Sequence, residues 1–238
     1  EGIRVASEVY APKLDKELGR KIFLPKTITS DLSNIKPDDY ADIRALVYTQ
    51  PRLTSIGKKK PEIFELEVGG SVSQKFNYLK ENLGKEIPLS TIFKPGEVVD
   101  VRSVTKGKGF QGAIKRFSNI CLTQKKSARK KRGPASTGPW HPNRVRWTVP
   151  MPGQMGYHRR THYNSIIFSI SDDISLVNQV GGNKHYGPVK NTYLLLKGSV
   201  AGPTRRLITL TKSLRAEKKM ITDLPVINYI HSSGMIKK

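Results

Sequence analysis

The alternation of apolar and polar positions predicts short β-strands along much of the chain. Residues 62–68 read Glu-Ile-Phe-Glu-Leu-Glu-Val, which is the period-two pattern of a half-buried strand. The run 191–200 is almost continuously apolar, which is typical of a strand buried on both faces. Further β-rich runs occupy residues 3–10, 45–48, 98–104, 164–171 and 205–211. Because Gly/Pro turns separate the later strands and helical patterns are few there, the pattern favours a small β-barrel.

Helical periodicity is confined to the first part of the chain. Residues 73–83 carry apolar side chains at positions i, i+3 and i+7, and Gly84 follows, which predicts an amphipathic helix with a glycine at its end. Residues 15–19 resemble a short helix that ends at glycine. Residues 37–46 look like a helix start with acids in its first turn. These patterns predict a mixed α/β unit.

The run 98–104 and a second extended segment, 110–117, are separated by a tight turn that presents two lysines. We expect a β-hairpin with a basic tip. Gly107 and Gly109 lack the GxxxxGK[ST] frame, so the turn is not a nucleotide-binding P-loop. Residues 118–163 show almost no periodicity, and a loop of that length is uncommon unless it is functional or disordered.

Charge changes the picture. The chain has 238 residues, a net charge of +23 and a pI of about 10.1, which makes nucleic acid the leading partner and an anionic membrane surface the second. No run of about 18 apolar residues predicts a transmembrane helix, and the first residues lack the pattern of a signal peptide. One cysteine excludes an internal disulfide framework and a multi-cysteine zinc site, as expected of a cytoplasmic protein.

The positive charge is concentrated. Residues 101–171 hold fifteen Lys and Arg, no Asp or Glu, and both tryptophans. Such charges repel one another in a lone domain, and a polyanion relieves the repulsion. Residues 25–95, with eleven basic and nine acidic residues, are close to neutral, which favours packing or protein contact over RNA contact.

The candidate chemistry is that of binding. Trp140 lies between two prolines in a stretch that cannot build a core, so we expect it to project and stack on a base. His158 and His162 are four residues apart, a metal-ligand spacing on a helix, but glycines precede them and no carboxylate is near in sequence. We therefore predict no metal site, no cofactor and no catalytic residue.

Five runs resemble the universal large-subunit ribosomal protein three family, in its archaeal and eukaryotic form. They are residues 58–70, 103–112, 138–150, 153–161 and 185–198. The resemblance implies a mainly β fold with a closed six-stranded β-barrel like that of translation factors, an α/β insertion and a long irregular basic extension. The boundaries it implies are 1–24 (barrel segment), 25–95 (insertion), 96–117 (barrel hairpin), 118–156 (rRNA-penetrating extension), 157–214 (barrel strands) and 215–238 (C-terminal tail).

The same resemblance implies a structural constituent of the large ribosomal subunit that binds and organises 23S-type rRNA. The extension, with Trp140 near its tip, would reach toward the peptidyl-transferase centre, where RNA performs the chemistry. The implied partners are large-subunit rRNA and neighbouring ribosomal proteins, without a membrane. The family has a further N-terminal region with a barrel strand, so we expect a second polypeptide or a longer chain to supply it.

The charge pattern and the resemblance together predict a set of rRNA-binding residues. They are Lys106, Lys108, Lys115, Arg116, Lys125, Lys126, Arg129, Lys130, Lys131, Arg132, Trp140, His141, Arg144, Arg146, Trp147, Tyr157, His158, Arg159, Arg160, Arg205 and Arg206. The alternatives are a free-standing RNA-binding or RNA-modifying protein, and a DNA-compacting or membrane-surface protein. An enzyme would need a cofactor-binding loop or a set of acid/base residues, and the sequence shows neither. A DNA-compacting protein would be basic throughout, whereas residues 25–95 are close to neutral.

Overall fold

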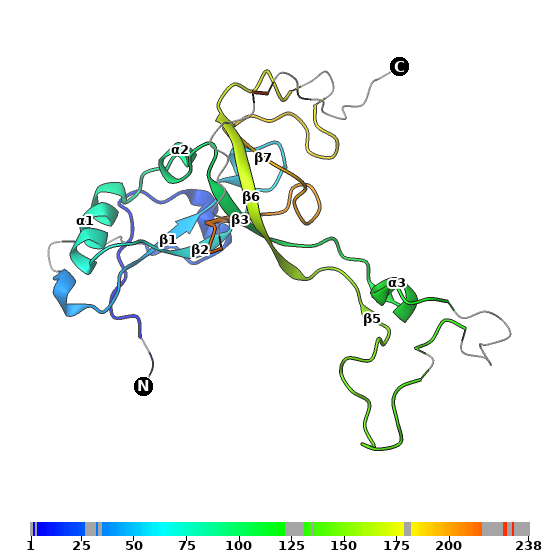
Figure 1. Cartoon of the computed structure of the whole chain (residues 1–238). Helices are drawn as coiled ribbons and strands as arrows, with labels where there is room; N and C mark the ends of the chain where they lie inside the picture. The colour runs from blue at the N-terminus through cyan, green and yellow to red at the C-terminus, as the bar shows by residue number, and fades with distance from the viewer. Residues whose placement is uncertain are drawn as a thin grey trace. The chain divides into compact units, whose positions relative to one another are not determined.

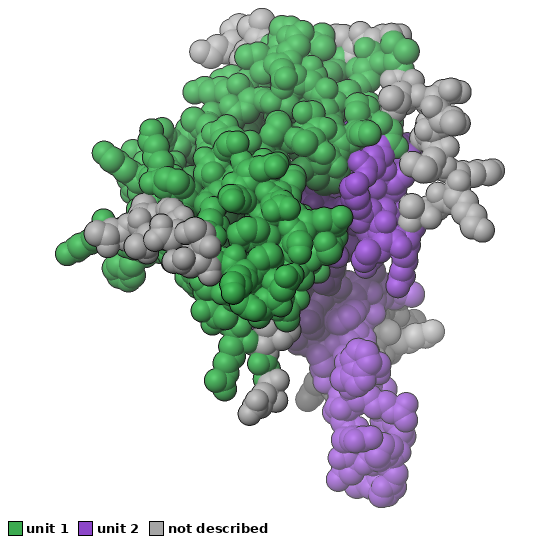
Figure 2. Space-filling view, turned by 90° about the vertical axis from the view of Figure 1, so that its left-hand side faces the viewer, with its two compact units in different colours: residues 1–96, 168–195, 222–238 green, residues 97–167, 196–221 purple. Residues whose placement is uncertain are grey.

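The structure is a computed structural model (Figure 1). It describes residues 2, 4–26, 32, 35–121, 131–134, 136–178, 182–215, 226, 227 and 230. The chain divides into two compact units, shown in green and purple in Figure 2. The first unit comprises residues 1–96, 168–195 and 222–238, and the second comprises residues 97–167 and 196–221.

The first unit contains a two-stranded antiparallel sheet and two helices. Strands β1 (Arg44–Tyr48) and β2 (Ile63–Glu67) pair in the register Arg44↔Glu67 to Tyr48↔Ile63, which confirms two predicted strands. Helix α1 (Val72–Asn82) confirms the predicted amphipathic helix. It begins with a capping box in which the side chains of Ser71 and Gln74 each bind the other's backbone N–H. Helix α2 (Leu89–Ile92) is a single turn.

A nearly buried ion pair ties α1 to the residues before β1. Lys75 is 8% exposed, and its Nζ lies 2.7 Å from Oδ1 of Asp42. Arg44 donates to the other oxygen of Asp42 from 3.1 Å. The hydrogen bond from Lys75, and after it the one from Arg44, lowers the pKa of Asp42 to about 2. The Asp42 carboxylate therefore stays charged at neutral pH and holds the helix against the strand.

Three predicted elements of the first unit take other forms. Residues 4–10 form no strand, because they have no pairing partner within the described part of the chain. The predicted first helix is a 3-10 turn, Lys16–Arg20, whose first N–H groups are capped by Asp15. The predicted helix from residue 37 is limited to the 3-10 turn Pro37–Asp39, since the chain becomes extended at Tyr40 and soon enters β1.

A four-stranded sheet with the order β7-β6-β3-β8 supplies the core. Strand β3 (Val98–Val104) lies between β6 (Arg159–Ser171) and β8 (Thr209–Lys212), antiparallel to both, and β7 (Tyr193–Leu196) flanks β6. The most buried hydrophobic side chains of the sheet are those of Val99, Val101 and Ile167, each 2% exposed or less. Burial of these side chains is the main stabilising term of the sheet.

The fold is mainly β with few helices, as predicted. In the described residues β7 and β8 are the two edges of the sheet, so its order is open and the closed six-stranded barrel stays a prediction. The predicted strand 191–200 is shorter, and the side chains of β7 are only half-buried. The predicted strand 205–211 begins later, at Thr209.

A buried carboxylate joins three strands at a β-bulge of β3. Asp100 has no exposed surface, and the register of β3 against β6 shifts beside it. Its carboxylate accepts hydrogen bonds from the backbone N–H of Asn164 at 3.0 Å and of Leu214 at 3.3 Å. Burial acts to raise the pKa of Asp100, but these donated hydrogen bonds outweigh it and lower the pKa. Asp100 therefore holds β6 and the residues just after β8 onto β3.

The predicted hairpin over residues 98–117 is wrong. The neighbours of β3 are β6 and β8, whereas β4 (Phe110–Gln111) pairs with β5 (Gly153–Gln154). The residues after β4 form helix α3 (Ala113–Phe117), whose N-cap is Gly112. The apolar residues at positions 113, 114 and 117 fit one face of a helix, and the true partner of β4 lies far away in sequence.

Candidate nucleic-acid interface

The predicted basic extension is an arm, which we define as the described residues between 105 and 158. Its root is a two-chain ribbon that continues β3 and β6 away from the sheet (Figure 1). Thr105 N–H donates to His158 O at 3.0 Å. Farther out, Lys108 N–H donates to Met155 O and Met155 N–H donates to Gly109 O, each at 2.9 Å. These bonds and the β4–β5 pair make the root an ordered β-ribbon.

Glycine allows the two chains of the ribbon to approach closely. Gly156 has φ +71°, and a Cβ atom at this position would lie 2.0 Å from the carbonyl oxygen of Lys106. Only glycine combines this left-handed conformation with such an approach. The following residue, Tyr157, also has a positive φ, so the returning chain turns sharply at residues 156 and 157.

Arg116 fastens helix α3 to the returning chain. Its Nη1 donates to Met151 O at 2.8 Å, and its Nε donates to Gln154 O at 3.2 Å. The guanidinium also lies 5.0 Å from the ring centroid of Phe117. The charge pattern and the resemblance predicted that Arg116 binds RNA. The structure gives it an internal role, and its RNA contact stays a prediction.

Arg206 has a similar role where the arm leaves the sheet. Its Nη1 donates to Val104 O at 3.0 Å and to Thr105 O at 2.9 Å, and its guanidinium lies 5.3 Å from the ring centroid of Tyr157. Nearby, Ser103 Oγ donates to Ala201 O at 2.7 Å. The loop 201–206 therefore holds the first residues of the arm. The sequence analysis predicted RNA binding for Arg206, and the charge of a side chain does not reveal an internal partner.

Large aromatic side chains of the arm are exposed. Trp140 is 83% exposed and Trp147 94%, and Phe110 and Tyr157 are mostly exposed as well. The structure thus confirms that Trp140 projects. Clusters of large exposed apolar groups mark binding surfaces in soluble proteins. Their flat rings suit stacking on unpaired bases.

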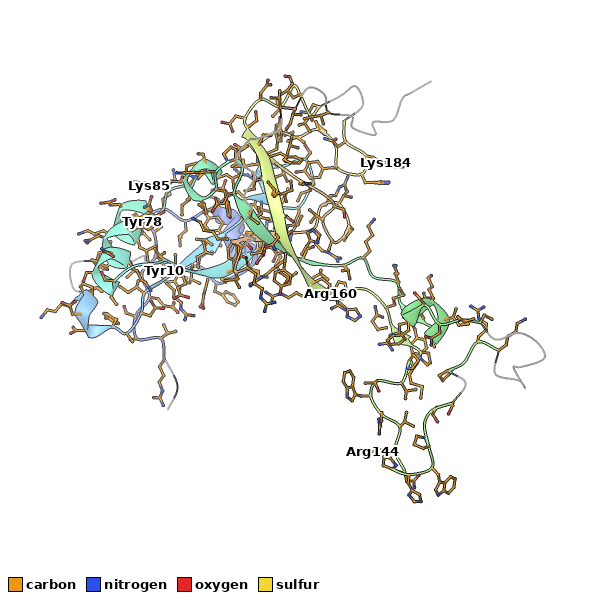
Figure 3. All side chains as sticks on the ribbon, in the orientation of Figure 1. Tyr10, Tyr78, Lys85, Arg144, Arg160 and Lys184 are labelled. Carbon is orange, nitrogen blue, oxygen red and sulfur yellow. The ribbon has the colours of Figure 1, made fainter. Side chains whose placement is uncertain are left out.

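The arm and its root carry exposed cations without acidic partners. In the part of the chain that the structure describes, no carboxylate lies within 4 Å of these side chains. Figure 3 places Arg144 in the distal loop, by which we mean residues 136–152, and Arg160 near the root. The exposed cations are Lys106, Lys108, Lys115, Lys131, Arg132, Arg144, Arg146, Arg159, Arg160 and Arg205. The predicted contacts Lys125, Lys126, Arg129 and Lys130 lie outside the described residues.

The described histidines of this region are not gathered into a cluster of metal-ligand side chains. His141 is exposed in the distal loop, and the backbone N–H of His158 donates to Thr105 Oγ1 at 3.2 Å. His162 is part of β6, so the spacing of four between His158 and His162 does not fall on a helix. Among the described residues, no group of three His, Cys, Asp or Glu side chains is placed to hold a metal ion. Nor is any described helix long and apolar enough to cross a membrane.

Comparisons with known proteins place these features in a family. The sequence model of the family described as Ribosomal protein L3 matches residues 8–235. The chain is 47% identical over 235 residues to the large ribosomal subunit protein uL3 of Methanocaldococcus jannaschii, covering 96% of this chain and 69% of that protein. It is 46% identical over 245 residues to the protein of the same name from Methanothermobacter thermautotrophicus, with 98% and 72% covered. The chain thus spans about 70% of the length of these relatives.

Proposed function

Because the chain belongs to the family of ribosomal protein L3, in its archaeal-type form, we propose that it is a structural constituent of the large ribosomal subunit in the cytoplasm. In that subunit it binds and organises 23S-type rRNA. The observation that carries the proposal is the arm, an ordered ribbon with exposed arginines, lysines and tryptophans and no carboxylate. The family assignment supports a structural role, in which the RNA performs the chemistry.

Electrostatics supply most of the binding in this proposal. Each exposed Lys or Arg of the arm neutralises a phosphate and releases a counterion, so affinity falls steeply with salt. Arginine adds bidentate contacts to phosphate and stacking on bases. Lys106 and Lys108 extend from the ribbon, while Arg144 and Arg146 extend from the distal loop, so cations occupy both ends of the arm. Arms of this kind hold separate RNA helices together.

The end of the arm provides stacking. Trp140 and Trp147 expose most of their surface in the described structure. Stacking of a base on such a ring contributes about 1–3 kcal/mol. By resemblance, the loop that carries Trp140 reaches toward the peptidyl-transferase centre, and no residue of the chain acts catalytically there.

The closed barrel is the finer part of the proposal. The edges of β7 and β8 present unpaired backbone groups in the described sheet. Closure into six strands requires strands beyond these four, from the same protein or from a neighbouring polypeptide. The mainly β fold and the strong twist expected at the β3 bulge are consistent with closure.

Sedimentation tests the proposed function. In a sucrose gradient of a native lysate, we expect the chain in the fractions of the large subunit. We expect it to remain there after a moderate salt wash, because many phosphate contacts are buried in the assembled particle. Detection of the chain across fractions at low and high salt provides the measurement. If the chain stays at the top of the gradient, the assignment fails and a free RNA-binding protein becomes the better explanation.

Tryptophan fluorescence tests the arm directly. Both tryptophans lie in the arm and are exposed, so their emission should be that of water-exposed indole. Addition of large-subunit rRNA is expected to quench this emission as bases stack on the rings. Trp140→Ala and Trp147→Ala should each weaken binding about 5- to 150-fold, since stacking contributes about 1–3 kcal/mol per base. An unchanged spectrum at saturating RNA would show that the rings stay in water.

A further inference from the structure

Two loops of the first unit, one before β2 and one between β6 and β7, contact each other. The loop that precedes β2 contains Ser55, whose Oγ donates to the carbonyl oxygen of Pro188 at 2.5 Å. A Cβ atom at Gly187 would lie 3.4 Å from Cβ of Ser55, so the two backbones are in close contact. These contacts join residues 55–60 to residues 182–190, although the segments are far apart in sequence.

The second loop is held in shape by its own hydrogen bonds. Asn178 donates from Nδ2 to Val189 O and accepts from Val189 N–H at Oδ1, each at 2.7 Å. Asn183 and Gly187 exchange two backbone hydrogen bonds of 3.1 and 2.9 Å, which closes a tight turn. Lys184 lies in this turn and points outward in Figure 3. The turn thus presents a cation at a fixed place.

Four lysines lie near the junction of the two loops. Lys59 and Lys60 follow Ser55, while Lys184 and Lys190 flank Pro188. Each lysine is at most five residues from Ser55 or Pro188, the two residues that form the junction. An extended chain advances at most about 3.6 Å per residue. The Cα atoms therefore lie within about 18 Å of the junction. We call Lys59, Lys60, Lys184 and Lys190 the lysine quartet.

The charge of the lysine quartet is not compensated. The acid nearest to it in sequence, Glu62, is already paired with Lys58 and lies 3.6 Å from Nζ of Lys21. The hydrogen bond from Lys58 lowers the pKa of Glu62, so this carboxylate is ionised and paired with Lys58 and Lys21, not with the lysine quartet. All four side chains of the quartet are exposed, and no described carboxylate lies within 4 Å of them. Residues 25–95 have a net charge close to zero, so their composition does not reveal this local excess of positive charge.

We propose that the lysine quartet is a second phosphate-binding surface, which contacts the RNA backbone independently of the arm. The inference rests on the proposed function, because that function makes RNA the partner. Lysine ammonium groups act on phosphate as point charges. Tyr186, the aromatic residue of the turn, is half-buried. The contact is therefore electrostatic and independent of base sequence. It fixes the first unit to RNA while the arm fixes the second.

The test compares two variants of the full chain with equal loss of charge. The first, K59Q/K60Q/K184Q/K190Q, removes the lysine quartet. The control, K13Q/K16Q/K80Q/K85Q, removes four exposed lysines of the same unit, three of which directly adjoin an acid in sequence. Binding to transcribed archaeal large-subunit rRNA is measured by filter retention at several salt concentrations. Because each duplex phosphate contact contributes about 0.9 to the slope of log K against log salt, we expect the slope of the quartet variant to be smaller in magnitude by about 3.6.

The outcomes separate the two proposals. We expect the control to keep a slope within about one of the wild-type slope, and the quartet variant to bind at least tenfold more weakly at low salt. If wild-type protein binds steeply but the two variants have the same slope, the lysine quartet does not contact RNA and the inference is overturned, while the proposed function stands. The inference is also overturned if the quartet variant loses only a protein neighbour in the assembled subunit. Weak, shallow binding by wild-type protein overturns both proposals.

Discussion

Gly156→Ala is expected to disrupt the root of the arm and to lower RNA affinity at least tenfold. The added Cβ would lie 2.0 Å from the carbonyl oxygen of Lys106 and 3.1 Å from its carbonyl carbon. The clash is with backbone, which has no rotamer to change, so the two chains of the ribbon must separate. The left-handed conformation at φ +71° costs a non-glycine residue a further ~1–2 kcal/mol. The neighbouring bond from Tyr157 N–H to Lys106 O would be lost first.

A matched control lies across the same ribbon. A Cβ at Gly107 would be 3.7 Å from Cβ of Tyr157, an ordinary contact, and φ at Gly107 is not positive. Gly107→Ala should therefore bind RNA nearly as well as wild type. Amide hydrogen exchange at Lys108 and Met155 provides a second readout, because both amides donate within the ribbon. We expect Gly156→Ala to lose this protection while the amides of β3 keep theirs. Equal protection in the two variants would contradict the argument.

Asp100→Ala is expected to lower the free energy of unfolding of the sheet by about 3 kcal/mol. The substitution removes the buried carboxylate that accepts hydrogen bonds from the backbone N–H groups of Asn164 and Leu214, and a hydrogen bond to a charged group contributes about 1.5–3 kcal/mol. Urea unfolding followed by far-UV circular dichroism provides the measurement. Tryptophan fluorescence would not serve, since both tryptophans lie in the arm. Asp172→Ala, at an exposed aspartate, is the control and should change stability by less than about 0.5 kcal/mol.

The same carboxylate predicts a pH dependence. The pKa of Asp100 is lower in the folded protein than its ordinary value, so its ionised form stabilises the fold. This contribution is present above the unfolded pKa of about 3.9 and is lost as pH falls through the folded pKa. Asp100→Asn should therefore show a smaller loss of stability than wild type below about pH 4. Parallel acid-unfolding curves for the two proteins would show that Asp100 does not couple folding to protonation.

Local periodicity explains what the sequence could predict of the fold. The alternation in β2 and the i, i+3, i+7 pattern in α1 are set by neighbours a few residues away. The pairing of β4 with β5 joins Phe110 to Gln154, and nothing near either residue indicates that partner. The hairpin error arose because a glycine-rich turn between two extended runs favours local pairing. The competing long-range ribbon leaves no periodic signal.

In the candidate site too, local patterns were predictable from the sequence and long-range contacts were not. The absence of acids and the prolines around Trp140 correctly indicated an exposed, cationic, projecting segment. Charge could not show that Arg116 and Arg206 direct hydrogen bonds to backbone carbonyl oxygens of the arm. Likewise, the lysine quartet depends on a contact between Ser55 and Pro188, which residue spacing does not reveal. Composition identifies a cation, whereas only tertiary structure identifies its partner.

The ribbon also determines the order in which the arm can form. Its innermost pair, Val104 with Arg159, belongs to the sheet, and the pairs farther out enclose successively shorter loops. The entropy cost of closing the long loop arises when the innermost pair forms, and each later pair of the ribbon adds little to that cost. The pairs of the ribbon should therefore form in sequence, beginning in the sheet and ending with the pairing of β4 and β5. The distal loop is the last segment to be fixed, so it can still adjust to RNA that is itself being assembled.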